Sequence, residues 1–459
     1  MKKKLAMTLI ITMLLSMILS GCDKASNISK SVIKPDGETL ELTILISVED
    51  INFFKKNQVL DEYKKSFEKN FGIKVTYSPV GTIINSDESL NNYYKELATK
   101  LYTKGGAELI YCSDITIETL IKQKAVLDLS DKVKNISNIY DGLLGKEVFY
   151  VPIGIGGRVM ALNKDVLLEL GLNEPDFDWS LNNYYEIRDK WVSKNVRVFT
   201  SRDYYDIYGK YLSDVRVFDM ENNKAHVNTE EIVSTINKMR EEIFSGKYEL
   251  ENFTYENYYN MLYVPTSEEW IDNYKIKSST EYKNSHFLNE SMGNDIDPFK
   301  AKDIDGRRNI NNLIVLPDVK NTKKYLSTWG FMVNANGKNL DLAYEFINGM
   351  LENEFQWKIF EDKDLMYPVS KNIEADILNL EANQGLDEKS IEMKKYFLDQ
   401  VKNGNRQFAI TQSYKENQLR EMFIKDFSQF IFGDKSYSDT ELSIELQKLE
   451  DKYNIFLSE

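Results

Sequence analysis

Cysteine and histidine are both scarce in this sequence, which holds two of each among its 459 residues. A small disulfide-stapled scaffold needs a higher cysteine content, and most structural zinc sites need four Cys or His ligands. The 22 glycines follow no three-residue period, so a collagen-like chain is excluded as well. We therefore expect neither a disulfide framework nor a metal site.

Catalytic and cofactor-binding motifs are also missing. The chain contains no G-x-S-x-G, H-E-x-x-H, C-x-x-C or P-loop pattern. Gly154 and Gly156 open a G-x-G-x-x-G spacing, but Val159 stands where the last glycine belongs. An EF-hand-like stretch has Ala301 and Asn312 at positions that need acidic ligands. We assign no catalytic residue and no cofactor from the sequence.

Basic clusters are absent beyond the extreme N-terminus, and the formal net charge is −14. Nonspecific nucleic-acid binding needs a clustered Lys/Arg face, so we expect no nucleic-acid partner. Aromatic residues make up 12% of the chain, which is too many for a disordered protein. At about 150 residues per domain, the length favours two or three domains, or two large lobes.

The first 22 residues have the pattern of an export signal. Three lysines precede an apolar run, Leu5–Leu19, which is too short to span a membrane comfortably. The segment LSGC, ending at Cys22, then resembles a bacterial lipobox, in which cleavage leaves a diacylated N-terminal cysteine. The alternatives are an ordinary secretory signal with a chance cysteine, or an N-terminal membrane helix. We predict a signal peptide at 1–21, lipid attachment at Cys22, and a flexible tether at 22–38 on the extracytoplasmic face of the cell membrane.

Folded sequence begins near residue 40. The segment 40–47 predicts a buried strand, and Val59, Tyr63 and Phe67 recur at every fourth residue in a helix that Gly72 ends. Further along, 73–77 and 107–112 predict strands, and 90–101 and 115–124 predict helices. This β-α-β-α-β-α order indicates a parallel sheet covered by helices, with ligands beyond the carboxyl ends of its strands.

The periodicity is uneven in the rest of the chain. Helices are predicted over 164–170, from residue 178, over 343–351 and over 442–456, and a strand over 331–333. Between about 200 and 325 the apolar residues follow no clear period, so no element is predicted there.

The order of these features resembles the family 1 extracellular solute-binding proteins, the lipoprotein receptors of ABC importers, many of which bind sugars. The resemblance extends over most of the chain. Its pieces are the lipobox, the strand at 42–46, FEKNFGIKV (67–75), AELIY (107–111), AVLDLS (125–130), YVP (150–152), LNKD (162–165), LGL (170–172), GFMV (330–333), AYEF (343–346) and YPVSK (367–371).

The resemblance implies an α/β fold of two periplasmic-binding-protein-like lobes with a hinge and an interlobe cleft. Lobe 1 would take 39–149 plus 326–373, and lobe 2 would take 150–325 plus 374–459. A small solute, expected to be a carbohydrate, would bind in the cleft, and permease subunits of an ABC transporter would detect closure. A maltose-type relative has an acidic residue where this chain has Gly156, so no particular sugar is assigned.

Candidate ligand contacts come from both lobes. Glu49 follows the first strand at its carboxyl edge, although a solvated loop would explain it equally well. Tyr111 and Asp114 match a family position where an aromatic ring and a carboxylate face the cleft. Core packing is the alternative for Tyr111.

The remaining candidates lie near the two chain crossings. Gly156 would allow close approach of the backbone to ligand, or simply form a hinge. Arg158 would pair with an anionic group of the ligand or with a carboxylate of its own lobe. Trp329, at the second crossing, is the strongest aromatic candidate, with Trp270 and Tyr367 as weaker ones that core packing would also explain.

The function predicted on these grounds is a binding receptor rather than an enzyme. Two alternatives remain open. One is a surface glycosidase, because a catalytic carboxylate pair is recognised by its spatial separation and not by its spacing in sequence. The other is a ligand-sensing or interaction lipoprotein that uses the same fold.

Overall fold

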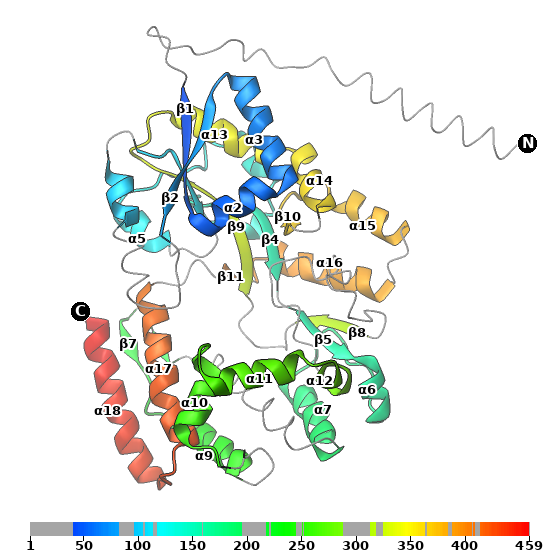
Figure 1. Cartoon of the computed structure of the whole chain (residues 1–459), viewed down its shortest axis with the longest axis vertical. Helices are drawn as coiled ribbons and strands as arrows, with labels where there is room; N and C mark the ends of the chain where they lie inside the picture. The colour runs from blue at the N-terminus through cyan, green and yellow to red at the C-terminus, as the bar shows by residue number, and fades with distance from the viewer. Residues whose placement is uncertain are drawn as a thin grey trace, which may run out of the picture.

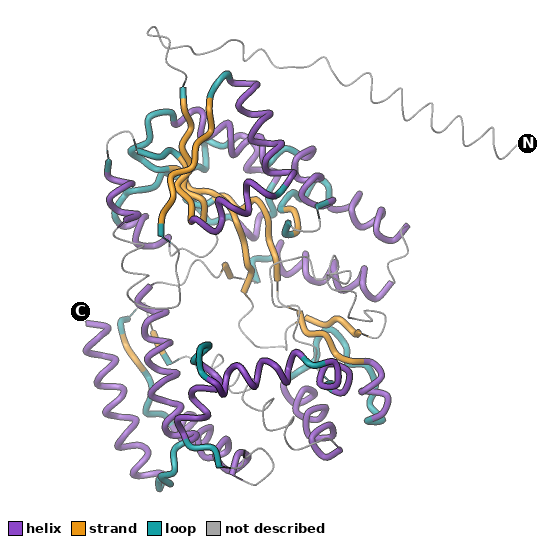
Figure 2. Tube along the Cα trace, in the orientation of Figure 1, coloured by secondary structure: helices purple, strands orange, loops and turns teal. Residues whose placement is uncertain are grey.

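The computed structural model of the chain is built from two bodies, drawn one above the other in Figures 1 and 2. The upper body contains the first strands, and the lower body contains the C-terminal helix. Among the described residues, no helix combines the length and apolar character needed to cross a membrane. The structure describes residues 40–81, 96–103, 106–112, 117–157, 159–194, 217–219, 222–244, 250, 252–287, 313–317, 325–362, 365–383, 388–405, 407–408 and 414–458.

The first three strands of the upper body are parallel, as the sequence predicts. Strand β1 (Glu41–Ser47) lies between β2 (Lys74–Val80) and β3 (Leu109–Cys112). Helix α3 (Gln58–Phe71) begins at Asn57, whose side chain accepts a hydrogen bond from the Leu60 N–H, and it ends at Gly72 with a φ of 64°. These caps confirm the helix between β1 and β2.

The sheet becomes mixed beyond β3. Strand β9 (Tyr325–Val333) runs antiparallel to β3, and β4 (Val151–Gly157) runs antiparallel to β9. The strand order is β10-β4-β9-β3-β1-β2, with β11 also pairing with β9. The predicted parallel arrangement is confirmed for the first three strands. The whole sheet is mixed, because a segment more than 200 residues later completes it with antiparallel pairings to β3 and β4. The two short strands are β10 (Tyr367–Pro368) and β11 (Gln407–Phe408).

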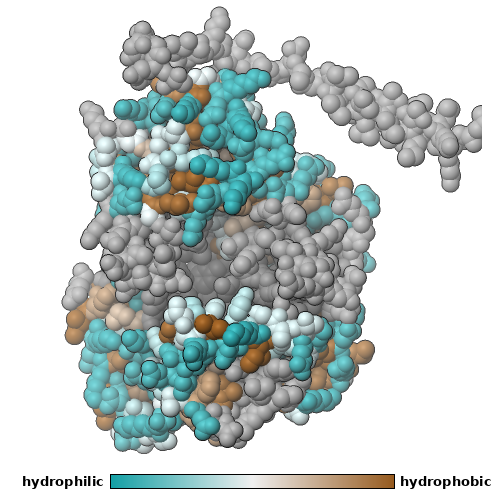
Figure 3. All heavy atoms as spheres, viewed as in Figure 1, coloured by the Kyte–Doolittle hydropathy of each residue, from teal (hydrophilic) through white to brown (hydrophobic). Residues whose placement is uncertain are grey.

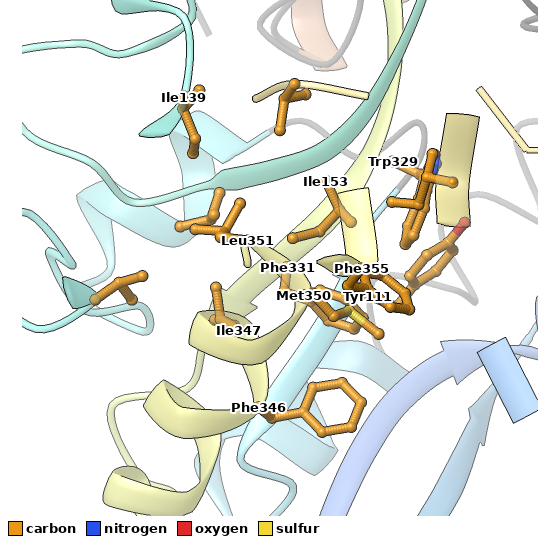
Figure 4. Close-up of a cluster of buried hydrophobic side chains, with 14 of the residues drawn as sticks. Tyr111, Ile139, Ile153, Trp329, Phe331, Phe346, Ile347, Met350, Leu351 and Phe355 are labelled. Carbon is orange, nitrogen blue, oxygen red and sulfur yellow. The ribbon is translucent and has the colours of Figure 1, made fainter. Parts of the chain in front are cut away.

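Two hydrophobic cores lie in the upper body, one on each face of the sheet. The first core joins the sheet to α3, α13 (Leu340–Met350) and α14 (Asn353–Glu361), and it includes Phe331 and Phe346. Figure 4 shows part of it, with Trp329 and Tyr111 together at one end. The smaller core on the other face includes Leu45, Ile110 and Met332. Burial on both faces explains the nearly continuous apolar runs of these strands.

The lower body has its own core. It is here called the second core, as distinct from the first core and the smaller core of the upper body. It includes Trp191, Ile236, Phe427 and Tyr453, from segments far apart in the sequence. Its elements are β5 (Val159–Asn163), α6 (Lys164–Glu169), α7 (Leu181–Lys194), β6 (Phe218–Asp219), β7 (Lys224–Ala225), α9 (Glu230–Phe244), α10 (Tyr255–Tyr263), α11 (Glu268–Ser278), α12 (Thr280–Ser285), β8 (Leu313–Pro317), α17 (Tyr414–Phe432) and α18 (Asp439–Ser458).

Helix α16 (Glu388–Lys402) contacts both bodies. Its C-terminal half contributes Phe397 and Val401 to the first core. The ring of Tyr396 lies 5.9 Å, between centroids, from the ring of Phe177, which packs against the second core. The remaining helices of the upper body are α2 (Val48–Lys56), α5 (Ile117–Lys122), α15 (Glu374–Asn383) and two 3₁₀ turns at 134–138 and 141–143.

Candidate functional site

The space between the two bodies is the candidate site. The face seen in Figure 3 is hollowed there, and we call this hollow the cleft. In Figure 1, α2 lies along the edge of the upper body that faces the cleft, and α11 lies along the facing edge of the lower body. The chain passes between the bodies from β4 to β5, from β8 to β9, and again from β11 to α17. The first two passages are here called the two crossings.

Close packing fixes the upper end of the two crossings. In the β4–β9 register Gly154 faces Trp329, with a bulge between Pro152 and Gly154. A Cβ on Gly154 would lie 2.4 Å from the indole Nε1 of Trp329. The Thr328 hydroxyl also donates a hydrogen bond to the Gly154 carbonyl at 3.0 Å. Glycine is required here so that the indole can lie flat against the strand.

Gly156 takes an ordinary place in the same strand. It is buried in β4 and paired with Ser327 of β9. Within the described residues, the group that closely approaches this glycine-rich segment is therefore the ring of Trp329, which lies against Gly154.

The structure brings two of the expected aromatic ligand contacts together. Trp329 and Tyr111 have 4% and 6% of their surface exposed, and their ring centroids are 6.3 Å apart. The ring of Phe54 forms T-shaped contacts with both rings, with its centroid 6.3 Å from that of Trp329 and 5.0 Å from that of Tyr111. Among the described residues, Trp329 Nε1 has no hydrogen-bond partner. Most of this aromatic surface is thus in contact with protein.

Tyr367 belongs to the same core. It lies in β10, opposite Ile155 of β4, and 4% of its surface is exposed. The ammonium of Lys394, in α16, lies 5.6 Å from the centre of its ring and 2.5 Å from a carboxylate oxygen of Glu381. Lys394 is itself 2% exposed, so this ion pair is buried. Tyr367 accordingly connects the crossing strands to α16.

The upper edge of the cleft carries exposed acidic and apolar groups. Helix α2 starts at Ser47, whose hydroxyl accepts a hydrogen bond from the Asp50 N–H and donates one to the Asp50 carboxylate at 2.6 Å. Glu49 is exposed in the first turn of α2. Val48 and Phe53 of the same helix are 49% and 37% exposed. Acceptor oxygens and apolar surface are therefore both available at this edge.

The lower edge carries the most exposed aromatic surface. Helix α11 is capped by Ser267, whose hydroxyl accepts a hydrogen bond from the Trp270 N–H at 3.1 Å. The half-buried ring of Trp270 stacks on Tyr274, with centroids 5.3 Å apart and planes at 5°. Tyr274 is 59% exposed. A hydrogen bond from Asn257 lowers the pKa of the neighbouring Glu269 carboxyl, which is therefore ionised at neutral pH.

The other expected site residues lie outside the described residues: Asp114, Arg158 and Cys22. Two residues absent from the sequence-based set stand out instead. Tyr274 was detectable as the i+4 neighbour of Trp270, which shares its helix face. Phe53 lies in α2, a helix without a periodic apolar pattern in the sequence.

This combination of groups suits a polar, ring-shaped ligand. Flat aromatic faces contact the C–H faces of sugars, and carboxylate oxygens accept hydrogen bonds from hydroxyl groups. Within the part of the chain that the structure describes, no group of three or more His, Cys, Asp or Glu is arranged to hold a metal ion.

Sequence comparison identifies a family. The model of the family described as bacterial extracellular solute-binding protein matches residues 54–357, well over half of the chain. No curated protein sequence matches this chain. The family match includes β2, β3, β4 and β9, which form most of the sheet described above.

Solved structures with the same fold come from several bacteria. An ABC substrate-binding protein of Listeria monocytogenes, solved with cycloalternan, has 16% identity and a TM-score of 0.54, covering 92% of this chain and 100% of its own. The GacH receptor of Streptomyces glaucescens, solved unliganded and with acarbose, has 16% identity and a TM-score of 0.53, covering 92% and 99%. The cyclic alpha-maltosyl-1,6-maltose binding protein of Arthrobacter globiformis has 12% identity and a TM-score of 0.52, covering 92% and 99%. At these identities the likeness is one of fold.

Proposed function

Because the chain belongs to the family of bacterial extracellular solute-binding proteins, we propose that it is a receptor that captures a small carbohydrate and delivers it to an ABC importer. The observation that carries this proposal is the presence of two bodies, each with its own core, on either side of a cleft. The helices along its two edges, α2 and α11, carry exposed aromatic and acidic side chains. A ligand that contacts both edges at once stabilises the closed form, and closure is the signal a transporter can detect.

The proposal includes the cellular location and the division into lobes. Signal peptide removal after residue 21 and diacylation of Cys22 would tether the protein to the outer face of the membrane. The resemblance puts lobe 1 at 39–149 with 326–373 and lobe 2 at 150–325 with 374–459. We propose that lobe 1 also takes β4, α15, the C-terminal half of α16 and β11, because they belong to the sheet or to the first core. Radiolabelled palmitate incorporated by cells expressing the chain, and lost on Cys22→Ala, would support the anchor. Unchanged labelling of this variant would contradict it.

Ligand binding is tested on the soluble chain from residue 23. Titration calorimetry with malto-, cello-, xylo- and galacto-oligosaccharides should give saturable heat for at least one series. The same ligand at 100 times its Kd should raise the free energy of unfolding by about 2.7 kcal/mol. If no carbohydrate changes either quantity, the proposed function is wrong.

Delivery requires that the solute leaves unchanged. We therefore expect the bound carbohydrate to be recovered intact after prolonged incubation with the protein, as judged by chromatography and a reducing-end assay. Continued release of reducing ends from an oligosaccharide or polysaccharide would instead identify the chain as a glycosidase.

A further inference from the structure

Helix α18 carries apolar side chains on two opposite faces. Its inner face buries Leu442, Leu446 and Tyr453 in the second core. On its outer face, Ile444 and Ile455 are 53% and 63% exposed. A surface helix normally keeps its apolar residues on the side of the core. Packing within the lower body therefore does not explain these two isoleucines.

The two isoleucines share one narrow stripe of α18. At 3.6 residues per turn, eleven residues bring Ile455 to within about 20° of Ile444 around the helix axis and about 16.5 Å along it. Lys448 and Asp451, both exposed, lie between them on the same side, within a sector about 60° wide. These four residues are here called the outer stripe. From one end to the other it reads Ile, Lys, Asp, Ile.

The outer stripe is separate from the candidate site. Figure 1 shows α18 as the outermost helix at one side of the lower body. It packs there against β7, α9 and α17, whereas α2 and α11 lie along the edges of the cleft. A partner on the outer stripe would thus use a different part of the surface from a ligand in the cleft.

The outer stripe is complementary to itself. A two-fold axis through its centre places a second copy of α18 antiparallel to the first. Ile444 of each copy then faces Ile455 of the other, and Lys448 of each copy faces Asp451 of the other. A parallel pair would instead oppose lysine to lysine and aspartate to aspartate. The pattern therefore favours one orientation of one partner, a second copy of the chain.

The flanks of the stripe fit the same arrangement. The antiparallel register places the exposed Gln447 opposite Lys452, and the exposed Glu441 opposite Ser458, so no like charges meet across the axis. A membrane surface would instead require a broad apolar face with basic margins. Two isoleucines separated by a lysine and an aspartate do not provide such a face.

The present contacts of the two charged residues do not prevent the pairing. Lys448 pairs with Glu445 of the same helix at 2.8 Å while 65% of its side chain is exposed. The Asp451 carboxylate accepts a hydrogen bond from the Gln447 amide at 3.0 Å. Contacts as exposed as these contribute little to stability. They can therefore be exchanged for ion pairs between two copies at little cost.

We propose that the outer stripe of α18 is a self-association surface, through which two copies of the chain form an antiparallel helix pair with two-fold symmetry. This inference does not depend on the identity of the ligand. Each copy contributes one helix about 30 Å long. The dimer is consequently weak and reversible, as is typical of interfaces that bury less than about 1,200 Å².

Sedimentation equilibrium of the soluble chain from residue 23 tests the association, at protein concentrations from about 1 to 300 μM. The parent should show a monomer–dimer equilibrium. Ile455→Asp should raise the dimer Kd by about 10-fold or more, because it places a carboxylate against Ile444 of the second copy. Leu168→Asp is the matched control. It makes the same kind of change at a leucine of α6 that is 77% exposed, and it should leave the Kd unchanged.

Exchange of charges tests the antiparallel register. Lys448→Glu opposes two acidic residues twice in each dimer, and Asp451→Lys opposes two basic ones, so each variant alone should be monomeric over this range. An equimolar mixture of the two variants restores both pairs of opposite charge. It should form a heterodimer with a Kd within about 3-fold of that of the parent. Thermal unfolding of each variant verifies that the fold is retained.

The proposal is overturned if the parent remains monomeric over the whole range, or if Ile455→Asp and Leu168→Asp change the Kd equally. It is also overturned if Lys448→Glu alone dimerises like the parent, or if the mixture associates no better than either variant alone. None of these results bears on the proposed receptor function, which the carbohydrate titrations test separately.

Discussion

Gly330 of β9 pairs with Pro152 of the neighbouring strand β4, and no side chain fits there. A Cβ at this position would be 2.1 Å from the Val151 carbonyl oxygen and 2.9 Å from the Pro152 Cα. Both obstacles are backbone atoms that cannot rotate away. We expect Gly330→Ala to lower the free energy of unfolding by about 1–3 kcal/mol or more, as measured by urea denaturation. Gly81→Ala is the control, because its new Cβ would meet only a Glu96 side-chain oxygen at 3.4 Å; equal effects of the two substitutions would contradict this account.

Trp329 supplies a second prediction at the scale of the residue. Because 4% of its surface is exposed and its ring packs against Phe54, Tyr111 and Gly154, Trp329→Ala should lower the free energy of unfolding by about 3–5 kcal/mol. Trp329→Phe should cost less, since the indole N–H has no hydrogen-bond partner among the described residues to lose. Denaturation without ligand measures both. A fully stable Trp329→Ala would mean that the ring contributes mainly to ligand binding.

The site was only partly predictable at this scale. An aromatic residue followed by glycine at a crossing directs attention to Trp329, and the resemblance of Tyr111 and Asp114 to a family position directs attention to Tyr111. The structure places the two rings side by side. The sequence does not predict whether the two rings are accessible to ligand. Phe54 packs against both rings, and it comes from a helix that has no periodic apolar pattern. The roles of Glu49, Trp270 and Tyr367 in binding remain predictions.

Gln356 links three elements of the upper body. Its side chain is fully buried and donates hydrogen bonds to the carbonyls of Ile153, in the β4 bulge, and Met350, at the end of α13. Its carbonyl accepts from the N–H groups of Val369 and Ser370, just after β10. The bulge in β4 is thus stabilised by a side chain from α14, two hundred residues away.

Replacing this amide should be costly. Gln356→Met keeps the volume but leaves buried backbone donors and acceptors without partners, at about 1–3 kcal/mol each. We expect a loss of several kcal/mol in urea denaturation. The same change at the exposed Gln58, which donates a hydrogen bond to Glu62 within α3, should cost less than about 1 kcal/mol. A tolerated Gln356→Met would show that water replaces the amide.

Elements with local signals were predictable, and those fixed by distant partners were not. Helix α3 has periodic apolar residues, an N-cap and a terminal glycine, so its bounds follow from sequence. Strand β9 is different: GFMV indicates a strand, but the antiparallel pairing with β3 and β4 depends on contacts across more than 150 residues. Between 200 and 325 no element was predicted. Helix α9 was missed although its buried Ile232, Ile236, Met239 and Ile243 recur at helical spacing. In α10 to α12, aromatic and polar residues are mixed, and the period is harder to recognise.

At the scale of the whole molecule, α16 connects the two bodies outside the crossing strands. Lys389, near its start, pairs with Glu174 of the lower body at 2.6 Å, and Glu174 also pairs with Lys164 of α6 at 2.9 Å. Near its end, Lys402 pairs with Glu374 of α15 at 2.6 Å. Any closing motion of the lobes must therefore move α16 with one body and strain its contacts with the other.

The Glu174 contact makes this coupling dependent on pH. Hydrogen bonds from Lys389 and then Lys164 lower the pKa of the Glu174 carboxyl below its usual range. A carboxyl whose folded pKa is depressed stabilises the folded state above its unfolded pKa, and that stability is lost as pH falls through the folded pKa. Glu174→Gln should therefore unfold more easily than the parent at pH 7, by about 1 kcal/mol at most because the pair is partly exposed.

The difference should vanish as the pH falls below the lowered pKa of the folded state, where the parent carboxyl is protonated as well. Urea denaturation at several pH values measures it. The control is Glu354→Gln, which makes the same charge change in an ion pair within α14 and thus within one body. Small-angle scattering then tests the coupling between the lobes separately from stability. At pH 7 only Glu174→Gln should change the radius of gyration of the unliganded protein, because it should shift the balance between open and closed forms. If both variants leave those dimensions unchanged, α16 follows the motion of the lobes without constraining it.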